Sequence, residues 1–172
     1  MSGEPAKVTM TVPLLDLKAQ YATIRADVDA AVRSVMDSAR FIGGPEVVGL
    51  EEEVARYSQC AHGVGCASGT DALLLSLWAL GVGPGDEVVT TAYSFFATAG
   101  VIVNNGATPV FVDIDPRTYN LDPLKLEEAF TPRTKAVIAV SLYGQCCDVP
   151  AIKAVCDRHQ AYLIEDAAQS IG

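Results

Sequence analysis

The stretch 83–91 reads Gly83-Pro84-Gly85-Asp86-Glu87-Val88-Val89-Thr90-Thr91, a turn rich in glycine and proline followed at once by β-branched residues. A short apolar run bounded by a turn is typical of a buried strand. Comparable runs occur on both sides of it, and segments with helical spacing of apolar residues separate them. This alternation predicts an α/β fold with three αβα layers, in which helices cover both faces of a mostly parallel sheet.

The same patterns predict the individual elements. The expected strands are Gly63–Ala67, Glu87–Thr91, Thr108–Val112, Ala136–Val140 and Ala161–Glu165, and the helices between them are Thr70–Leu80, Ser94–Asn104, Pro123–Ala129 and Val149–His159. Apolar residues recur at helical spacing over Asp16–Ser38 and Glu46–Ser58, so two more helices are expected there. We expect residues 1–40 to form an N-terminal segment with a helix, and residues 41–172 to form part of one larger domain.

Composition narrows the class of protein. The chain has 172 residues, half of them hydrophobic, which is enough for a domain with a real core. A net charge of -9 argues against a nucleic-acid partner or a polybasic membrane contact. Met1–Thr11 has no apolar signal-peptide core, and no apolar stretch is long enough to span a bilayer. We therefore expect a cytoplasmic protein.

The five cysteines are odd in number and show no paired Cys-x-x-Cys spacing. This usage indicates reduced thiols rather than a disulfide framework. A metal site built from Cys147, Cys156 and His159 is conceivable, but without a paired Cys-x-x-Cys spacing the cysteines are better interpreted as buried or incidental. We expect no metal.

Polar motifs follow several predicted strands, where ligands of open α/β sheets bind. Ser68-Gly69-Thr70-Asp71 precedes a helix whose free amide groups could hold a phosphate. Gly69 would allow close approach of the backbone, and the Thr70 hydroxyl could donate to a phosphate oxygen. The alternative is an ordinary capping box in which Ser68 bonds the Asp71 amide. Alone, the motif favours the capping interpretation.

Two further motifs have similar alternatives. Tyr93-Ser94-Phe95-Phe96 could place an aromatic ring against a planar ligand, or Ser94 could cap a helix that buries both phenylalanines. Asp166 ends the last predicted strand, where its carboxylate could keep a pyridine nitrogen protonated or simply cap a helix. Gln169 follows one turn later. Ser141-Leu142-Tyr143-Gly144-Gln145 could shape a substrate pocket or only form a turn. The joint placement of these motifs at strand ends favours a site.

With these motifs in this order, the chain resembles the DegT-type sugar aminotransferases, which are fold type I pyridoxal-phosphate enzymes. The resemblance runs from about Val12 to Gly172. The matching blocks are Pro13–Leu17, Phe41–Glu46, Ala67–Leu73, Gly83–Val88, Gly106–Val110 and Glu165–Gln169. The stretches Asp115–Pro123 and Val140–Cys146 look most like members that aminate UDP-2-acetamido-2-deoxy-3-oxo-glucuronate in surface-polysaccharide synthesis, although many relatives carry histidine where Ser141 stands.

The resemblance implies a cofactor and roles for its ligands. Pyridoxal 5'-phosphate would be held by Gly69 and Thr70 at its phosphate, by Phe95 at its ring face, by Asp166 at its pyridine nitrogen and by Gln169 at its ring hydroxyl. Ser141 and Tyr143 are the substrate-side candidates. The family's Schiff-base lysine would lie beyond Gly172, and none of the five lysines of this chain stands at a matching position. No catalytic residue is therefore assigned within this chain.

The resemblance also implies an activity and partners. The full-length protein would transfer an amino group, typically from glutamate, to a nucleotide-linked keto sugar, and would act as a homodimer. A 4-keto sugar or a keto-inositol remains an alternative substrate, and a non-catalytic module that binds pyridoxal phosphate or a nucleotide sugar is an alternative function. We expect this chain alone to be inactive. We also expect it to be unstable, because the strand at 63–67 would lack its neighbours in the sheet.

Overall fold

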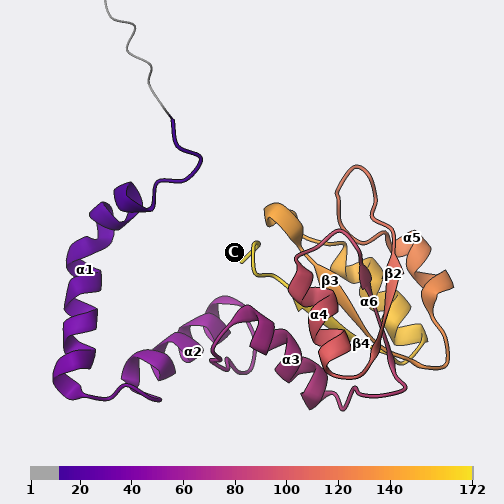
Figure 1. Ribbon diagram of the computed structural model, residues 1–172, viewed down its shortest axis with the longest axis horizontal. Coiled ribbons are helices and arrows are strands. Elements are labelled where there is room, and N and C mark those ends of the chain that lie inside the picture. The colour runs from indigo at the N-terminus through magenta and orange to yellow at the C-terminus, as the bar shows by residue number, and fades with distance from the viewer. Residues whose placement is uncertain (1–11, 172) are drawn as a thin grey trace, which may run out of the picture. The chain divides into compact units, whose positions relative to one another are not determined.

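The computed structural model describes residues 12–171 (Figure 1). They form two compact units that divide between Gly63 and Val64. The stretch Met1–Thr11, for which we expect no signal peptide, lies outside the described residues. None of the helices within residues 12–171 is long and apolar enough to cross a bilayer.

The first unit consists of two helices. Helix α1 spans Leu17–Ser38 and begins where the Asp16 carboxylate accepts a hydrogen bond from the Ala19 amide at 2.9 Å. Helix α2 spans Pro45–Tyr57, and its first residue is a proline, which suits a position without an intrahelical N–H partner. Both helices agree with the predicted ranges to within one residue at each end.

The second unit is an α/β sheet domain. Its elements in order are α3 (Gly69–Ala79), β1 (Glu87–Thr91), α4 (Phe96–Asn104), β2 (Thr108–Val112), α5 (Pro123–Leu126), a short 3-10 turn (Glu127–Ala129), β3 (Thr134–Val140), a second 3-10 turn (Leu142–Gly144), α6 (Val149–Arg158) and β4 (Tyr162–Asp166). The four strands pair in the order β2-β1-β3-β4, and every pair is parallel. The mostly parallel sheet is confirmed.

Side chains alternate between two cores, one on each face of the sheet. On one face, Leu73 and Leu77 of α3 and Ile102 of α4 pack against Val88 and Ile138. On the other face, helices α5 and α6 cover the sheet through Leu126, Ile152, Val155 and Cys156, which pack with Val89 and Val137. Because neighbouring strand residues point to opposite faces, Val88 and Val89 belong to different cores. The three-layer prediction is confirmed.

The predicted strand Gly63–Ala67 is wrong, because the structure has no strand there. The segment has no regular secondary structure and is not part of the four-stranded sheet, and Val64 is 81% exposed. Gly63 instead lies against the backbone of α2, where an added Cβ would come within 2.3 Å of the Glu51 carbonyl oxygen. Local apolar character alone does not make a strand, since a strand needs a neighbour for its backbone hydrogen bonds.

A buried carboxylate anchors the amino end of β1. Glu87 is 4% exposed and accepts hydrogen bonds from Thr131 and Arg133 in the turn before β3. The hydrogen bond from Thr131, followed by the charge of Arg133, holds the pKa of Glu87 below its ordinary value of 4.5. The turn at 131–134 is thereby fixed to the central strand.

Replacing Glu87 with glutamine should destabilise the second unit by about 2 kcal/mol at neutral pH, because the buried partner of Arg133 loses its charge. Since the folded pKa is lowered, this stabilisation is present above the ordinary pKa and is lost as the pH falls through the folded value. Urea unfolding at several pH values measures both effects. Glu128→Gln, at an exposed carboxyl nearby, is the control and should cost little at any pH. An equal cost at acidic and neutral pH would contradict the role of the charge.

Candidate functional site

The strand order reverses direction between β1 and β3, because the chain leaves β1 toward β2 and then returns to the other side of β1. Such a reversal opens a crevice beyond the carboxyl ends of the strands. A pocket of about 360 Å³ lies at this edge within the second unit. Its wall contains the cofactor residues expected from the sequence, namely Gly69, Thr70, Phe95, Asp166 and Gln169.

The amino end of α3 forms one wall of the pocket. Ser68 caps the helix, since its hydroxyl oxygen accepts from the Asp71 amide at 3.1 Å and its proton goes to the Asp71 carboxylate at 2.9 Å. Ser68 is therefore occupied by the capping interaction that the sequence offered as an alternative. The Thr70 hydroxyl makes no hydrogen bond within residues 12–171, and no atom lies within 4 Å of a Cβ built on Gly69. Open amides, an open glycine and a free hydroxyl suit an anion.

Packing holds this helix end at the sheet. Leu73 lines the pocket and joins Leu77 in the core, where both pack with Ile138 and Val140 of β3. The capped end of α3 is thus fixed beside the end of β3 by buried apolar contacts.

Phe95 forms a second wall. Helix α4 begins at Phe96, so Phe95 is the N-cap, and it is 73% exposed. The Ser94 hydroxyl lies 2.8 Å from that of Thr98 and does not cap the backbone. The interpretation of Ser94 as a cap before two core phenylalanines is wrong, since Phe96 is also 83% exposed. An exposed ring at a pocket wall can cover the face of a planar ligand.

The two acids at the end of β4 point to opposite faces of the sheet, as successive strand residues do. Glu165 accepts a hydrogen bond from the Ser141 hydroxyl at 3.0 Å. Asp166 is half-buried in the pocket wall, and its Oδ1 accepts from the Ala168 amide at 3.1 Å. Within the described residues, Asp166 is followed by a short turn and not by a helix. The Asp166 carboxylate retains acceptor capacity toward the pocket.

The two substrate-side candidates differ in burial: Ser141 is buried and Tyr143 is exposed. Ser141 lines the pocket but is 1% exposed, and its hydroxyl is engaged by Glu165 and by the Cys147 amide at 3.1 Å. Tyr143 stands at the rim, 72% exposed, and its backbone amide donates to Gln169 Oε1 at 2.7 Å. Ser141 therefore fixes the loop after β3, while the Tyr143 ring faces solvent beside the pocket.

Apart from Leu142, which belongs to the Ser141–Gln145 motif, the apolar part of the pocket was not singled out from the sequence. Leu73, Val140 and Leu142 contribute carbon surface between the polar groups, together with Ala97 and Ala168. Each of them looks like an ordinary core residue in the sequence. Only the convergence of α3 with the ends of β3 and β4 places them at a cavity.

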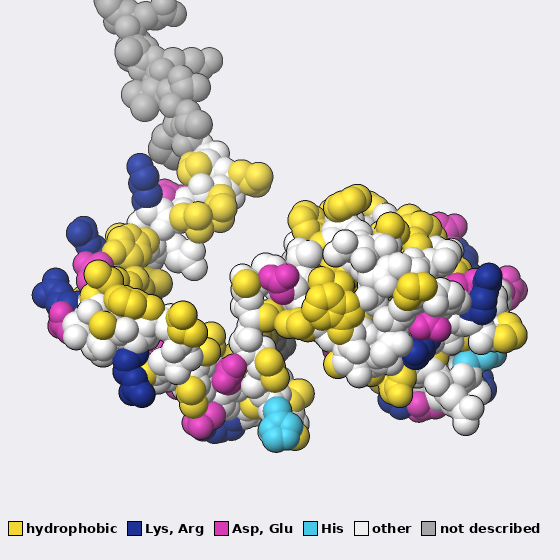
Figure 2. All heavy atoms as spheres, turned by 60° about the horizontal axis from the view of Figure 1, so that its bottom comes forward, with side chains coloured by type: hydrophobic (Ala, Val, Ile, Leu, Met, Phe, Trp, Pro, Cys, Tyr) yellow, Lys and Arg dark blue, Asp and Glu magenta, His cyan; other side chains and the backbone are white. Residues whose placement is uncertain are grey.

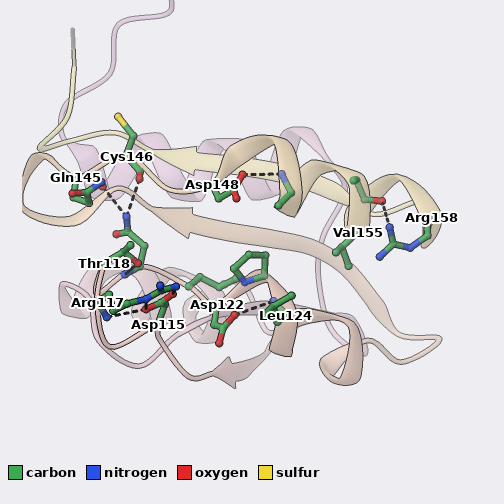
Figure 3. Close-up of a pocket in the computed structure, with 15 residues that line it drawn as sticks. Asp115, Arg117, Thr118, Asp122, Leu124, Gln145, Cys146, Asp148, Val155 and Arg158 are labelled. Atoms are coloured by element: carbon green, nitrogen blue, oxygen red, sulfur yellow. Dashed lines mark hydrogen bonds and ion pairs between the residues drawn. The ribbon is translucent and has the colours of Figure 1, made fainter.

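A larger cavity of about 770 Å³ lies between the 115–124 segment and α6 (Figure 3). Its carboxylates already have structural roles: Asp115 pairs with Arg117 at 2.9 Å, Asp122 caps α5 and Asp148 caps α6. The Arg117 hydrogen bonds lower the pKa of Asp115 to about 2. Because these charges are satisfied within the fold, the larger cavity offers less to a ligand than the smaller one.

The thiols show no sign of a shared site. Within the described residues no group of three or more histidine, cysteine or acidic side chains is placed to hold a metal ion. Cys147 and Cys156 are buried, and burial raises the pKa of Cys156 to about 11. His159 stacks on Phe130 with ring centroids 4.3 Å apart and contacts Glu127 at 2.6 Å.

Comparisons with known proteins agree on one family. A family model described as the DegT/DnrJ/EryC1/StrS aminotransferase family matches residues 22–172. A pleiotropic regulatory protein of Geobacillus stearothermophilus is 54% identical over 95% of this chain and 44% of its own length. The UDP-2-acetamido-2-deoxy-3-oxo-D-glucuronate aminotransferase of Pseudomonas aeruginosa is 52% identical over 94% of this chain and 45% of its own length.

A solved structure agrees as well. NtdA from Bacillus subtilis, with the bound cofactor PMP, has a TM-score of 0.91 and 35% identity, and the match covers 98% of this chain and 39% of that chain. The present chain spans less than half the length of the curated relatives it matches. Its fold is that of the large domain of pyridoxal-dependent aminotransferases, seen in part. The chain belongs to the DegT/DnrJ/EryC1/StrS aminotransferase family.

Proposed function

We propose that this chain provides the phosphate, ring-face and ring-nitrogen sides of a pyridoxal-phosphate site in a sugar aminotransferase. The observation that carries the proposal is the pocket at the strand ends, which brings together five residues from three separate parts of the sequence. Membership of the aminotransferase family supports the same cofactor.

The residues present fit the chemistry of this cofactor. A phosphate dianion suits the open amides of α3 and the free Thr70 hydroxyl. A flat pyridine ring suits the exposed face of Phe95, and a protonated ring nitrogen suits the Asp166 carboxylate. Gln169 keeps its side-chain NH₂ for the ring hydroxyl, because its carbonyl oxygen is engaged by Tyr143.

Each group would then have a defined task. Pyridoxal phosphate, when bound, supplies an electron sink for a carbanion beside the transferred nitrogen. Asp166 would keep the ring nitrogen protonated and so strengthen that sink, while α3 and Thr70 would anchor the phosphate. Phe95 would fix the plane of the ring. The lysine that carries the cofactor is proposed to come from sequence beyond Gly172.

Changing Thr70 to alanine tests the phosphate role. We expect the dissociation constant for pyridoxal phosphate to rise about tenfold, the cost of one hydrogen bond to a charged group. Equilibrium dialysis with the protein encoded by the complete gene measures this. Ser76→Ala is the matched control, because the Ser76 hydroxyl bonds the Ala72 carbonyl within the same helix at 2.7 Å and lies away from the pocket lining. Equal losses for both variants would show that α3 merely lost stability.

We further propose the substrate and setting. The amino donor is glutamate, and the acceptor is a UDP-linked 3-keto sugar used for surface polysaccharide, by a cytoplasmic homodimer. The motifs at 115–123 and 140–146 and the relative from Pseudomonas aeruginosa support this choice. A 4-keto sugar or keto-inositol acceptor is the alternative within the family.

A panel of keto substrates separates these possibilities. The protein encoded by the complete gene should form glutamate-dependent amino sugar fastest from the UDP-linked 3-keto compound. Cofactor binding without amination of any substrate would favour a non-catalytic module. The name of the Geobacillus stearothermophilus relative, a pleiotropic regulatory protein, is the reason to test this alternative. Measurable amination by residues 1–172 alone would contradict the proposal that the lysine lies beyond them.

A further inference from the structure

Three exposed tyrosines form a cluster beside the pocket, which we call the tyrosine platform: Tyr93, Tyr119 and Tyr143. They follow β1, β2 and β3, so they stand at the same carboxyl edge of the sheet as the pocket. They are 42%, 51% and 72% exposed, respectively. Hydrophobic side chains at the surface of the second unit are visible in Figure 2. A contiguous group of solvent-exposed aromatic rings at the carboxyl ends of the strands is typical of a binding surface.

The three rings contact one another. The ring centroids of Tyr93 and Tyr119 are 5.9 Å apart, and those of Tyr93 and Tyr143 are 6.3 Å apart in an edge-on arrangement. The hydroxyl oxygens of Tyr93 and Tyr143 lie 3.3 Å apart. The platform therefore presents aromatic faces together with a pair of neutral hydroxyl groups.

The backbone holds two of these rings in a conformation that non-glycine residues rarely adopt. Tyr119 has φ 62° and Tyr143 has φ 55°, both in the left-handed region. The Tyr119 amide donates to the Asp115 carbonyl at 2.8 Å, and the Tyr143 amide donates to Gln169 Oε1 at 2.7 Å. These contacts hold the backbone at both tyrosines, and the second one joins the platform to a residue of the pocket wall. Strain of this kind gathers at binding sites.

From this arrangement we infer that the tyrosine platform binds the sugar ring of the nucleotide-sugar substrate. The inference rests on the proposed function. A pyranose has an apolar face of C–H groups and a rim of hydroxyls, which match an aromatic face and phenolic hydroxyls. The three tyrosines carry no positive charge, so they suit the face of a sugar ring better than a pyrophosphate. Because the Tyr143 amide contacts Gln169 of the pocket wall, a sugar ring bound on the platform would lie next to the pocket.

Binding measurements can separate the sugar ring from the nucleotide. We would titrate the protein encoded by the complete gene with UDP-N-acetylglucosamine and with UDP, using calorimetry. Tyr93→Ala and Tyr119→Ala should each weaken binding of the UDP-sugar about tenfold, a size typical of losing one stacking ring. Both variants should bind UDP as the unmodified protein does.

The controls guard against a loss of folding. Tyr162→Ala removes a ring of similar exposure from the start of β4, at the amino ends of the parallel strands. It should leave the affinities for UDP and for the UDP-sugar unchanged. Tyr93→Phe keeps the ring and should retain most of the UDP-sugar affinity. Circular dichroism identifies a variant that fails to fold. Tyr93 and Tyr119 lie on separate loops. If one of the two alanine variants fails to fold, the binding measurements on the other one still test the inference.

Two results would overturn the inference. If the tyrosine variants lose affinity for UDP and for the UDP-sugar equally, the platform binds the nucleotide. If they lose affinity for neither, the platform is not part of the substrate site. The proposed function is judged separately, by cofactor binding and amination in the unmodified protein. An active enzyme with unaffected tyrosine variants would therefore refute the platform alone.

Discussion

Replacing Asp166 with alanine is expected to lower the rate of glutamate-dependent amination by at least about 100-fold, the usual loss when one preorganised electrostatic partner is removed. The reason is the position of this carboxylate in the wall of the candidate pocket. Without it, the pyridine nitrogen of the cofactor would lose the charge that keeps it protonated. The rate should be measured on the protein encoded by the complete gene, at saturating substrates.

Two variants sharpen this test. Glu165→Gln is the matched control, because Glu165 precedes Asp166 but points to the other face of β4, where it accepts from Ser141. It should retain most of the activity. Asp166→Asn should resemble Asp166→Ala in rate while preserving the shape of the wall. A pH titration of the bound cofactor's absorbance should show its ring proton leaving at lower pH in both Asp166 variants. Near-normal amination by Asp166→Ala would exclude the proposed role.

The largest effect on stability is expected for Leu77→Ala. Leu77 is fully buried in α3 and packs in the core formed with Val88 and Ile138. Truncating a buried leucine removes apolar contacts and leaves a cavity, which costs about 3 kcal/mol. Urea unfolding of the protein encoded by the complete gene measures this loss.

The same helix provides the control for this prediction. Leu75 lies on the outer side of α3 and is 44% exposed, so Leu75→Ala should cost about 0.5 kcal/mol or less. The Leu77 variant should also bind pyridoxal phosphate more weakly, because its cavity loosens the helix whose end forms the phosphate wall. Similar costs for the two leucines would mean that α3 does not pack on the sheet as described.

Much of the fold could be predicted from sequence because its signals are local. Glu87–Thr91 and Thr108–Val112 are short β-branched or apolar runs after glycine turns, and the structure gives both strands with the predicted bounds. The strand at 63–67 failed because strand formation depends on a neighbour, which no local pattern records. The starting residue of β3 was missed by two positions, since Thr134 and Lys135 are polar.

The candidate site was predicted less completely. Its polar members follow strands and could be found by that rule, and the structure gathers them around one pocket. The Ser141 hydroxyl donates to Glu165, 24 residues away, and the contact between Tyr93 and Tyr143 joins residues 50 positions apart. Such pairings come from the order of strands in the sheet. Sequence spacing alone does not reveal them.

The opposite orientation of Glu165 and Asp166 has a consequence for how this chain can vary. A deletion or insertion of one residue within β4 would slip the strand by one position and exchange the two carboxylates between the faces of the sheet. The pocket would then receive the wrong acid, and Ser141 would face the shorter aspartate in place of Glu165. Length changes within β4 should therefore abolish sugar amination, whereas length changes in surface loops should be tolerated. A library of single-codon deletions, selected for sugar amination, tests this expectation.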